Sequence, residues 1–275
     1  MKRSPVVRVI LYAFMLLLIM VYVFPVLWMV SVSVKDSKEI MSTSIRLIPA
    51  HFTLEHYALV FREFELGAWF CNSVGTTVGI TVFQVFTSLL AAFGLTYYHT
   101  RINKVLFYLL YFTMMVPFQV TMIPNYIVIS KLGLENRWLG VILPNIASVT
   151  TFYFLYQHLN DVPRTYYEAA QIDGGNAIWI FLHVALGLCG SAISAITILT
   201  VISSWNIYFW PLLVLTQSGK ATLTVALGQF TDPEFGNNWG SFMATATLST
   251  IPIVIIYFCV QRKIMDAFVG SGIKG

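Results

Sequence analysis

Long uncharged runs alternate along the chain with shorter segments that hold its charged residues. A helix needs about 20 apolar residues to cross the hydrocarbon core of a bilayer, so each run has room for one membrane span. The run 174–219 is long enough for two, but we place one there because its last part, Thr216-Gln217-Ser218-Gly219, is typical of a turn. The pattern predicts spans at about 9–31, 70–97, 105–123, 138–159, 185–214 and 239–260.

Composition supports a membrane protein. Hydrophobic residues make up 57% of the chain and charged residues 10%, with a mean hydropathy of +0.76. Soluble domains carry about 25% charged residues, so most of this chain cannot face water. A soluble enzyme and a disordered protein are both excluded. We predict an all-α polytopic membrane protein with six transmembrane helices, folded as a single domain over residues 1–275.

The distribution of Lys and Arg predicts the orientation, because cytoplasmic loops are enriched in these residues. With the N-terminus inside, the inside segments hold nine Lys and Arg in 46 residues, and the outside segments hold seven in 57. We therefore expect both termini in the cytoplasm. The net charge of +4 fits this bias, and because no run of five Lys or Arg occurs, no nucleic-acid partner is expected. The inside segments are 1–8, 98–104, 160–175 and 261–275.

No catalytic or cofactor motif is evident. The chain has no HExxH, GxSxG or GxGxxG, and Gly219-Lys220-Ala221-Thr222 lacks the residues of a phosphate-binding loop. We expect no catalytic residue, no metal site and no ATP site. No ionisable side chain needs to lie at the bilayer centre, which weakens a self-contained secondary carrier or channel for a small polar solute; that class remains the alternative.

The loop 160–183, expected in the cytoplasm, carries the clearest local signals. Asp161 or Thr165 can cap a short helix here. Thr165-x-x-Glu168 fits a capping box, in which a hydroxyl and a carboxylate each satisfy a free backbone N–H. Gly174 or Gly175 can supply the left-handed residue that ends it, and Asn176 can cap the next helix. The sequence predicts a short helix, a sharp glycine elbow and a second helix.

Two interpretations of this loop are open from composition. The small side chains of Ala169 and Ala170 would let a groove of another protein approach closely. The competing interpretation is a helix that lies on the membrane surface, and composition alone favours it.

The same loop resembles a known motif. Glu168-Ala169-Ala170-x-x-Asp173-Gly174, followed by Phe181 and Leu186, resembles the EAA motif of permease subunits of ATP-binding-cassette importers. Nearly the whole chain is similar to the smaller, six-span subunit of the sugar permease pair, the maltose-permease-like branch. The other motifs that carry this resemblance are Asn72-Ser73, Met115-Val-Pro-Phe-Gln-Val-Thr-Met-Ile-Pro124, Lys131-Leu-Gly-Leu, Ile142-Leu-Pro, Trp205-Asn-x-x-x-Trp-Pro-Leu-Leu213, Thr222-Leu-x-Val, Gln261-Arg-Lys and Gly272-Ile-Lys-Gly275.

The chain departs from the family pattern at the start of the fifth span. Gly187 and Ser191 stand where the family usually has two prolines. This makes the start of that span more flexible and puts in question how rigidly the loop transmits motion.

The resemblance implies a fold, partners and site residues. It implies a type I importer permease fold in a bacterial or archaeal cytoplasmic membrane, with a second permease subunit, two ATPase subunits that use ATP, and an extracytoplasmic solute-binding lipoprotein. This chain would be a non-enzymatic subunit that binds no cofactor. Its coupling helix would use Glu168 for capping and an ion pair, the two alanines for close docking, and Asp173 and Gly174 for the elbow.

Candidate residues for the solute path come from aromatic and amide chemistry. An aromatic face can stack on a sugar ring, and an amide can bind hydroxyls. The candidates are Asn72, Gln119, Trp205, Asn206 and Trp210, for which helix packing is the competing interpretation. A sugar, a polyol and a glycerol phosphate all fit as the solute.

Overall fold

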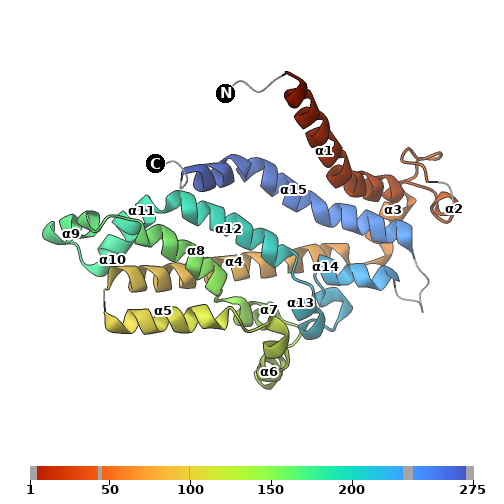
Figure 1. Cartoon of the computed structure of the whole chain (residues 1–275). Coiled ribbons are helices and arrows are strands. Elements are labelled where there is room, and N and C mark those ends of the chain that lie inside the picture. Colours follow the sequence, from red (N-terminus) through yellow and green to blue (C-terminus); the bar gives the residue numbers. More distant parts are fainter. Residues whose placement is uncertain (1–4, 43–44, 99, 232–237, 271–275) are drawn as a thin grey trace. The chain divides into compact units, whose positions relative to one another are not determined.

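The computed structural model describes residues 5–42, 45–98, 100–231 and 238–270 (Figure 1). Every element within these ranges is helical, apart from one isolated bridge between Lys35 and Phe52. The all-α fold class is therefore confirmed for the described part of the chain. The motif Gly272-Ile-Lys-Gly275 lies outside the described residues.

Three long helices are apolar enough to cross a membrane on their own. They are α1 (Pro5–Ser33), α4 (Leu66–Tyr97) and the part of α15 (Trp239–Gly270) up to residue 261. Three bent pairs raise the count to as many as six spans if each pair is one span. The first pair is α5 (Arg101–Thr113) with α6 (Phe118–Lys131), the second is α7 (Trp138–Ile142) and η1 (Leu143–Asn145) with α8 (Val149–Asn160), and the third is Ala177–Leu188 with α12 (Gly190–Trp205).

The bends fall inside segments that the sequence predicted as continuous. The expected span 105–123 is divided at residues 114–117, where the two helices meet at 96°. Pro117 is the N-cap of α6 and has an extended conformation. A proline disfavours the helical conformation in the residue before it, so a helix cannot continue from α5 through Pro117. The expected span 185–214 is bent by 79° at Cys189, and it ends as a continuous helix at Trp205.

The remaining helices are short. They are α2 (Ser37–Ile40), α3 (Glu55–Glu63), α9 (Arg164–Ile172), α10 (Ala177–Ile180), the π-helix η2 (Phe181–Ala185), α11 (Leu186–Leu188), α13 (Phe209–Val214), η3 (Ser218–Lys220), α14 (Leu223–Ala226) and η4 (Leu227–Thr231).

The chain divides into two compact units. The first comprises residues up to Leu66 together with Ala226–Pro252. In this unit His56 is buried, and its Nε2–H donates to the carbonyl oxygen of Lys35 at 3.0 Å. Its imidazole lies against Gly240, where a Cβ atom would overlap the ring.

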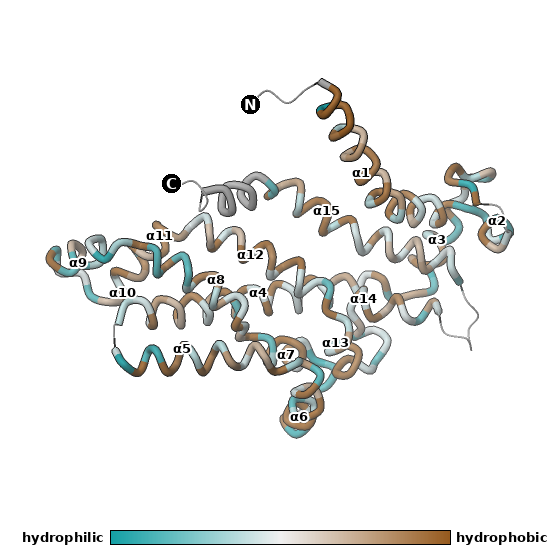
Figure 2. Tube along the Cα trace, in the orientation of Figure 1, coloured by the Kyte–Doolittle hydropathy of each residue, from teal (hydrophilic) through white to brown (hydrophobic). Residues whose placement is uncertain are grey.

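The second unit comprises Gly67–Val225 and the chain from Ile253 onward. It contains α4 to α13 and two apolar clusters (Figure 2). One cluster gathers α4, α8, α9 and the α10–α12 segment, and the other gathers α4, α6, α7 and α13. The buried members of the first include Phe93, Leu155, Leu159, Tyr167, Ala170, Ile180 and Phe181. Those of the second are Ile80, Ile129, Val141, Ile142, Trp210, Val214 and Leu215.

Two glycines on α4 let α7 approach closely. Gly75 and Gly79 lie one helical turn apart, and they face Trp138 and Ile142 of α7, which are also four residues apart. A Cβ atom at Gly75 would lie 2.5 Å from the Trp138 ring. This contact places the indole Nε1 of Trp138 2.8 Å from the side-chain oxygen of Asn72, to which it donates.

We predict that Gly75→Ala destabilises the protein. The added methyl group must displace the Trp138 ring, so the overpacked contact and the lost Asn72 bond lower the free energy of unfolding by about 1–3 kcal/mol. Gly94→Ala in the same helix is the control, because nothing lies within 4 Å of its Cβ position. The measurement is thermal denaturation in detergent. Equal midpoints for the two variants would show that α7 does not pack on Gly75.

Candidate functional site

The short helix predicted after residue 160 is present as α9, Arg164–Ile172, but its capping differs from the expectation. Its N-cap is Pro163, in an extended conformation, and no side chain caps it. The predicted capping box is therefore wrong: Thr165 lies inside the first turn, so neither its hydroxyl nor Glu168 serves as a cap. Asp161 instead follows α8 as its C-cap.

The glycine elbow is confirmed. Gly174 has a φ of +85°, the left-handed region that favours glycine, and its N–H donates to the carbonyl of Gln171 at 3.0 Å. The Gly175 N–H donates to the Ala170 carbonyl at 2.9 Å, which ends α9. Asn176 then caps α10 as predicted, because its Oδ1 accepts from the Trp179 N–H at 2.9 Å.

One face of α9 packs on the chain's own core. Tyr167 and Ala170 are each 6% exposed and belong to the cluster that holds Ile180 and Phe181. The expected role of Ala170 in close docking to another protein is therefore corrected: its methyl group packs within this chain. The side chain of Gln171 donates to the Tyr97 hydroxyl at 2.7 Å and so joins α9 to the end of α4.

The opposite face of α9 is open. Glu168, Ala169 and Ile172 are exposed, and Ile172 is 86% exposed. Figure 1 shows α9 extending past the ends of α4 and α8. The elbow thus presents a small patch with one carboxylate, one methyl group and one large apolar side chain, held on a helix whose other face is fixed.

Tyr167 anchors α9 through its ring. The ring centroid lies 6.3 Å from Phe93 and 6.0 Å from Tyr97, both in edge-on contacts. Its hydroxyl is buried and has no hydrogen-bond partner among the described residues. Burial raises the pKa of Tyr167 to about 12, so the side chain stays neutral at physiological pH.

Asn72, a solute-path candidate, is committed to the structure of the chain. It is buried, and its Nδ2 donates to the carbonyls of Gly219 at 2.9 Å and Ala221 at 3.1 Å. Next to it, the Ser73 hydroxyl accepts the Leu223 N–H at 2.8 Å. Together with the bond from Trp138, these contacts use the hydrogen-bonding groups that a solute would need, and they favour packing over the path.

The two tryptophans are also packed. Trp210 is 1% exposed and its Nε1 donates to the Gly140 carbonyl at 3.2 Å. Trp205 is buried, and its ring lies 6.1 Å from Phe70. Gln119 and Asn206 are exposed, and Asn206 donates through Nδ2 to the Ile202 carbonyl at 2.8 Å. The structure therefore divides the five candidates into three buried residues and two exposed ones.

The sequence did not single out Asn136. This residue has a φ of +55°, its Oδ1 accepts the Gln217 N–H at 2.9 Å, and its own N–H donates to the Val214 carbonyl at 2.9 Å. Asn tolerates the left-handed region, which is a usable signal for a turn. Its partners lie about 80 residues away in the chain, so their identity required the tertiary structure.

Bent membrane helices with an exposed helix–elbow–helix loop at one end fit the class of a polytopic transport permease. The fold agrees: the chain superposes with a TM-score of 0.83, at 23% identity, on a chain of the crystal structure of a bacterial ABC transporter involved in the import of the acidic polysaccharide alginate. The match covers 95% of this chain and 99% of the other.

Residues 84–267 match the family described as binding-protein-dependent transport system inner membrane component, and the chain belongs to this family. It is 32% identical to the arabinooligosaccharides transport system permease protein AraQ of Halalkalibacterium halodurans, over 100% of this chain and 99% of the relative. It is 26% identical to the lactose transport system permease protein LacG of Rhizobium radiobacter, with 98% and 97% covered. For the sn-glycerol-3-phosphate transport system permease protein UgpE of Salmonella typhi the identity is 27%, with 94% and 95% covered.

The resemblance inferred from the motifs is thus confirmed. The chain is a multi-pass membrane permease, a non-catalytic subunit of a binding-protein-dependent importer. Importers of this class combine a permease with a partner permease, ATPases and a binding protein.

We predict that the ring of Tyr167, and not its hydroxyl, stabilises α9. Tyr167→Phe removes a group with no described partner, so the free energy of unfolding should change by less than about 0.5 kcal/mol. Tyr167→Ala should lower it by about 3–5 kcal/mol because it empties a buried aromatic site. Thermal denaturation of the purified importer separates the two variants. A Phe variant as unstable as the Ala variant would mean that the hydroxyl is bonded.

Proposed function

We propose that this permease forms half of the translocation path for a carbohydrate or a related polyhydroxylated solute. The supporting observation is the set of solutes named for its relatives, arabinooligosaccharides, lactose and sn-glycerol-3-phosphate, all of which carry two or more hydroxyl groups. A second permease subunit supplies the other half, and an extracytoplasmic binding protein delivers the solute. Both termini lie in the cytoplasm, as the Lys and Arg bias predicts, and the membrane is that of a bacterium or archaeon, as the resemblance implies.

The single observation that carries the proposed mechanism is the two-faced geometry of α9. Tyr167 and Ala170 hold one face on the core, and Glu168, Ala169 and Ile172 are open on the other. The open face docks on one of two ATPase subunits, which bind and hydrolyse ATP. The methyl group of Ala169 allows close approach, Ile172 enters an apolar groove, and Glu168 pairs with a basic residue.

Motion passes from the ATPases to the path through the elbow. Asp173 and Gly174 set the angle between α9 and α10, and α10 leads into the bent segment that ends at Trp205. Nucleotide can shift the importer between two global conformations only by the difference in its affinity for them. The elbow must therefore stay rigid to pass that free-energy difference to the membrane helices.

The exposed amides remain the candidates for solute contact. Gln119, in the first turn of α6, and Asn206, after α12, each present a side chain that is not buried in this chain. An amide offers both a donor and an acceptor to the hydroxyls of a sugar.

We predict that Gly174→Ala impairs uptake through the elbow. A left-handed Ala costs about 1–2 kcal/mol, which reduces the population of the docking geometry roughly fivefold to 30-fold. Solute-stimulated ATP hydrolysis and uptake by the assembled importer should fall together.

The matched control is Gly133→Ala. Gly133 also has a positive φ, +64°, and like Gly174 it has nothing within 4 Å of a Cβ position, but it lies far from α9 in the chain. Both variants should lose similar stability, and only Gly174→Ala should lose coupling. Equal coupling in the two variants would refute the elbow's role, and uptake by the isolated chain in proteoliposomes would instead support the self-contained carrier.

We predict that Gln119→Leu weakens solute transport. Loss of one hydrogen bond to a hydroxyl is worth about 0.5–1.5 kcal/mol, which raises the KM of uptake about twofold to 12-fold. The buried Asn72→Leu is the contrasting variant, because it should lower the amount of folded protein and leave the KM of the remainder unchanged. A Gln119 variant with normal KM would remove this residue from the path.

A further inference from the structure

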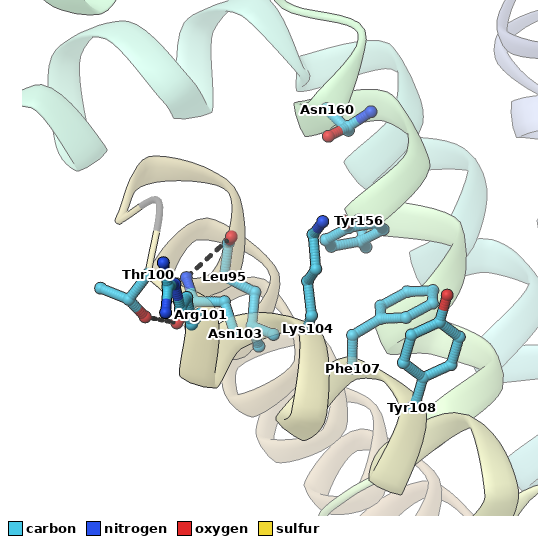
Figure 3. Close-up of a pocket in the computed structure, with 9 residues that line it drawn as sticks. All are labelled: Leu95, Thr100, Arg101, Asn103, Lys104, Phe107, Tyr108, Tyr156 and Asn160. Atoms are coloured by element: carbon cyan, nitrogen blue, oxygen red, sulfur yellow. Dashed lines mark hydrogen bonds between the residues drawn. The ribbon is translucent and has the colours of Figure 1, made fainter.

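A cavity of about 540 Å³ lies between the end of α4, the start of α5 and the C-terminal half of α8 (Figure 3). It lies within the second unit and shares no lining residue with α9 or with the solute-path candidates. Its lining residues are Leu95, Thr100, Arg101, Asn103, Lys104, Phe107, Tyr108, Tyr156 and Asn160.

The charge of this cavity has one sign. Arg101 and Lys104 line it and no carboxylate does. The ion pairs among the described residues, Lys35–Glu39 and Arg62–Glu63, both lie elsewhere, so the two cations have no described carboxylate partner. Figure 3 shows Lys104 reaching from α5 toward Tyr156 of α8. The cavity is therefore suited to an anion.

The walls are fixed by the fold. The Asn103 side chain accepts from the Thr100 hydroxyl at 2.7 Å and donates to the Leu95 carbonyl at 3.1 Å, which holds the turn between α4 and α5. The rings of Phe107 and Tyr156 pack with centroids 4.7 Å apart and form an aromatic side wall. The two cations are thus carried on a frame that is set before any ligand binds.

The surface next to the cavity is apolar. Ile102, Val105, Leu109 and Phe112 of α5 are between 58% and 67% exposed. Figure 2 shows α5 hydrophilic at its first turn and mostly hydrophobic beyond it. In a membrane protein this pattern places the first turn at the interface and the rest of the helix against acyl chains. Tyr108 lies one helical turn beyond Lys104 and also lines the cavity.

We propose that this cavity binds the phosphodiester headgroup of an anionic phospholipid, such as phosphatidylglycerol, from the cytoplasmic leaflet. The guanidinium of Arg101 and the ammonium of Lys104 hold the phosphate oxygens, and the acyl chains run along the exposed apolar face of α5. A soluble phosphate would use the cations and leave that face uncovered. The assignment to the cytoplasmic leaflet rests on the orientation given under the proposed function.

The site lies close to the elbow. It holds the turn that follows Tyr97, whose hydroxyl accepts from the Gln171 side chain of α9 at 2.7 Å. A lipid bound there stabilises the end of α4 on which α9 is anchored.

The test compares the intact importer with a variant that carries Arg101→Gln and Lys104→Gln. The importers are placed in nanodiscs of phosphatidylcholine with and without phosphatidylglycerol, and bound phosphatidylglycerol is counted by native mass spectrometry after release into detergent. Each near-surface cation contributes about fivefold to anionic-lipid affinity, so the double variant should bind about 30-fold more weakly.

The matched control carries Lys131→Gln and Arg137→Gln, which removes the same charge from two exposed residues, the last of α6 and the one that precedes α7. It should bind phosphatidylglycerol as the wild type does, and the charge-preserving pair Arg101→Lys and Lys104→Arg should retain most of the binding. Unchanged phosphatidylglycerol binding in the Gln variant would overturn the proposal.

Two further arms separate other occupants. Displacement of the bound lipid by inorganic phosphate or glycerol phosphate alone would assign the cavity to a soluble anion. Loss of the second permease subunit in the Gln variant would assign the α5 face to a subunit contact. Because the readout is bound lipid, an importer that binds phosphatidylglycerol normally but moves no carbohydrate would contradict only the proposed function.

Discussion

Asn72 joins α4 to the backbone of the segment that follows α13, through two hydrogen bonds from one side-chain amide. Where a helix is interrupted, backbone carbonyls need hydrogen-bond partners from elsewhere in the protein or from water. The amide of Asn72 donates to the carbonyls of Gly219 and Ala221, which lie nearly 150 residues away in the chain. Indole N–H groups act in the same way, Trp69 toward Ser218 and Trp210 toward Gly140. These hydrogen bonds fix the segment after α12 against α4 and α7.

The motifs that carry the family resemblance are therefore parts of one structure. Asn72-Ser73 binds the segment that ends in Thr222-Leu-x-Val, and Ile142 of another motif packs on the α4 glycines. Trp210 and the Gly140 carbonyl join two more separated segments. Short motifs that are far apart in the sequence are contact partners in the fold. These contacts explain why amide, hydroxyl and indole groups occur inside otherwise apolar runs.

Local chemistry made part of the fold predictable. Uncharged runs predicted an all-α membrane protein, and glycine and asparagine predicted the elbow at Gly174 and the cap at Asn176. Hydropathy indicates that a segment is apolar but not where its helix axis changes direction. The 96° bend between α5 and α6 was therefore not predicted. Trp210 was a candidate for the solute path, with helix packing as the competing interpretation, because composition cannot distinguish a pore-facing indole from one whose N–H is bonded to a distant carbonyl.

The unbroken length of α4 and the contacts at its two ends make it the transmission element of the proposed mechanism. It runs from Leu66 to Tyr97 with no proline, unlike the segments around it that bend. Asn72 near its start holds the turns after α12, and Tyr97 at its end holds α9. These two contacts are separated by 25 residues, which is about 38 Å of helix at 1.5 Å per residue. In the proposed mechanism, this unbroken helix carries a displacement of the elbow to the opposite end of the path.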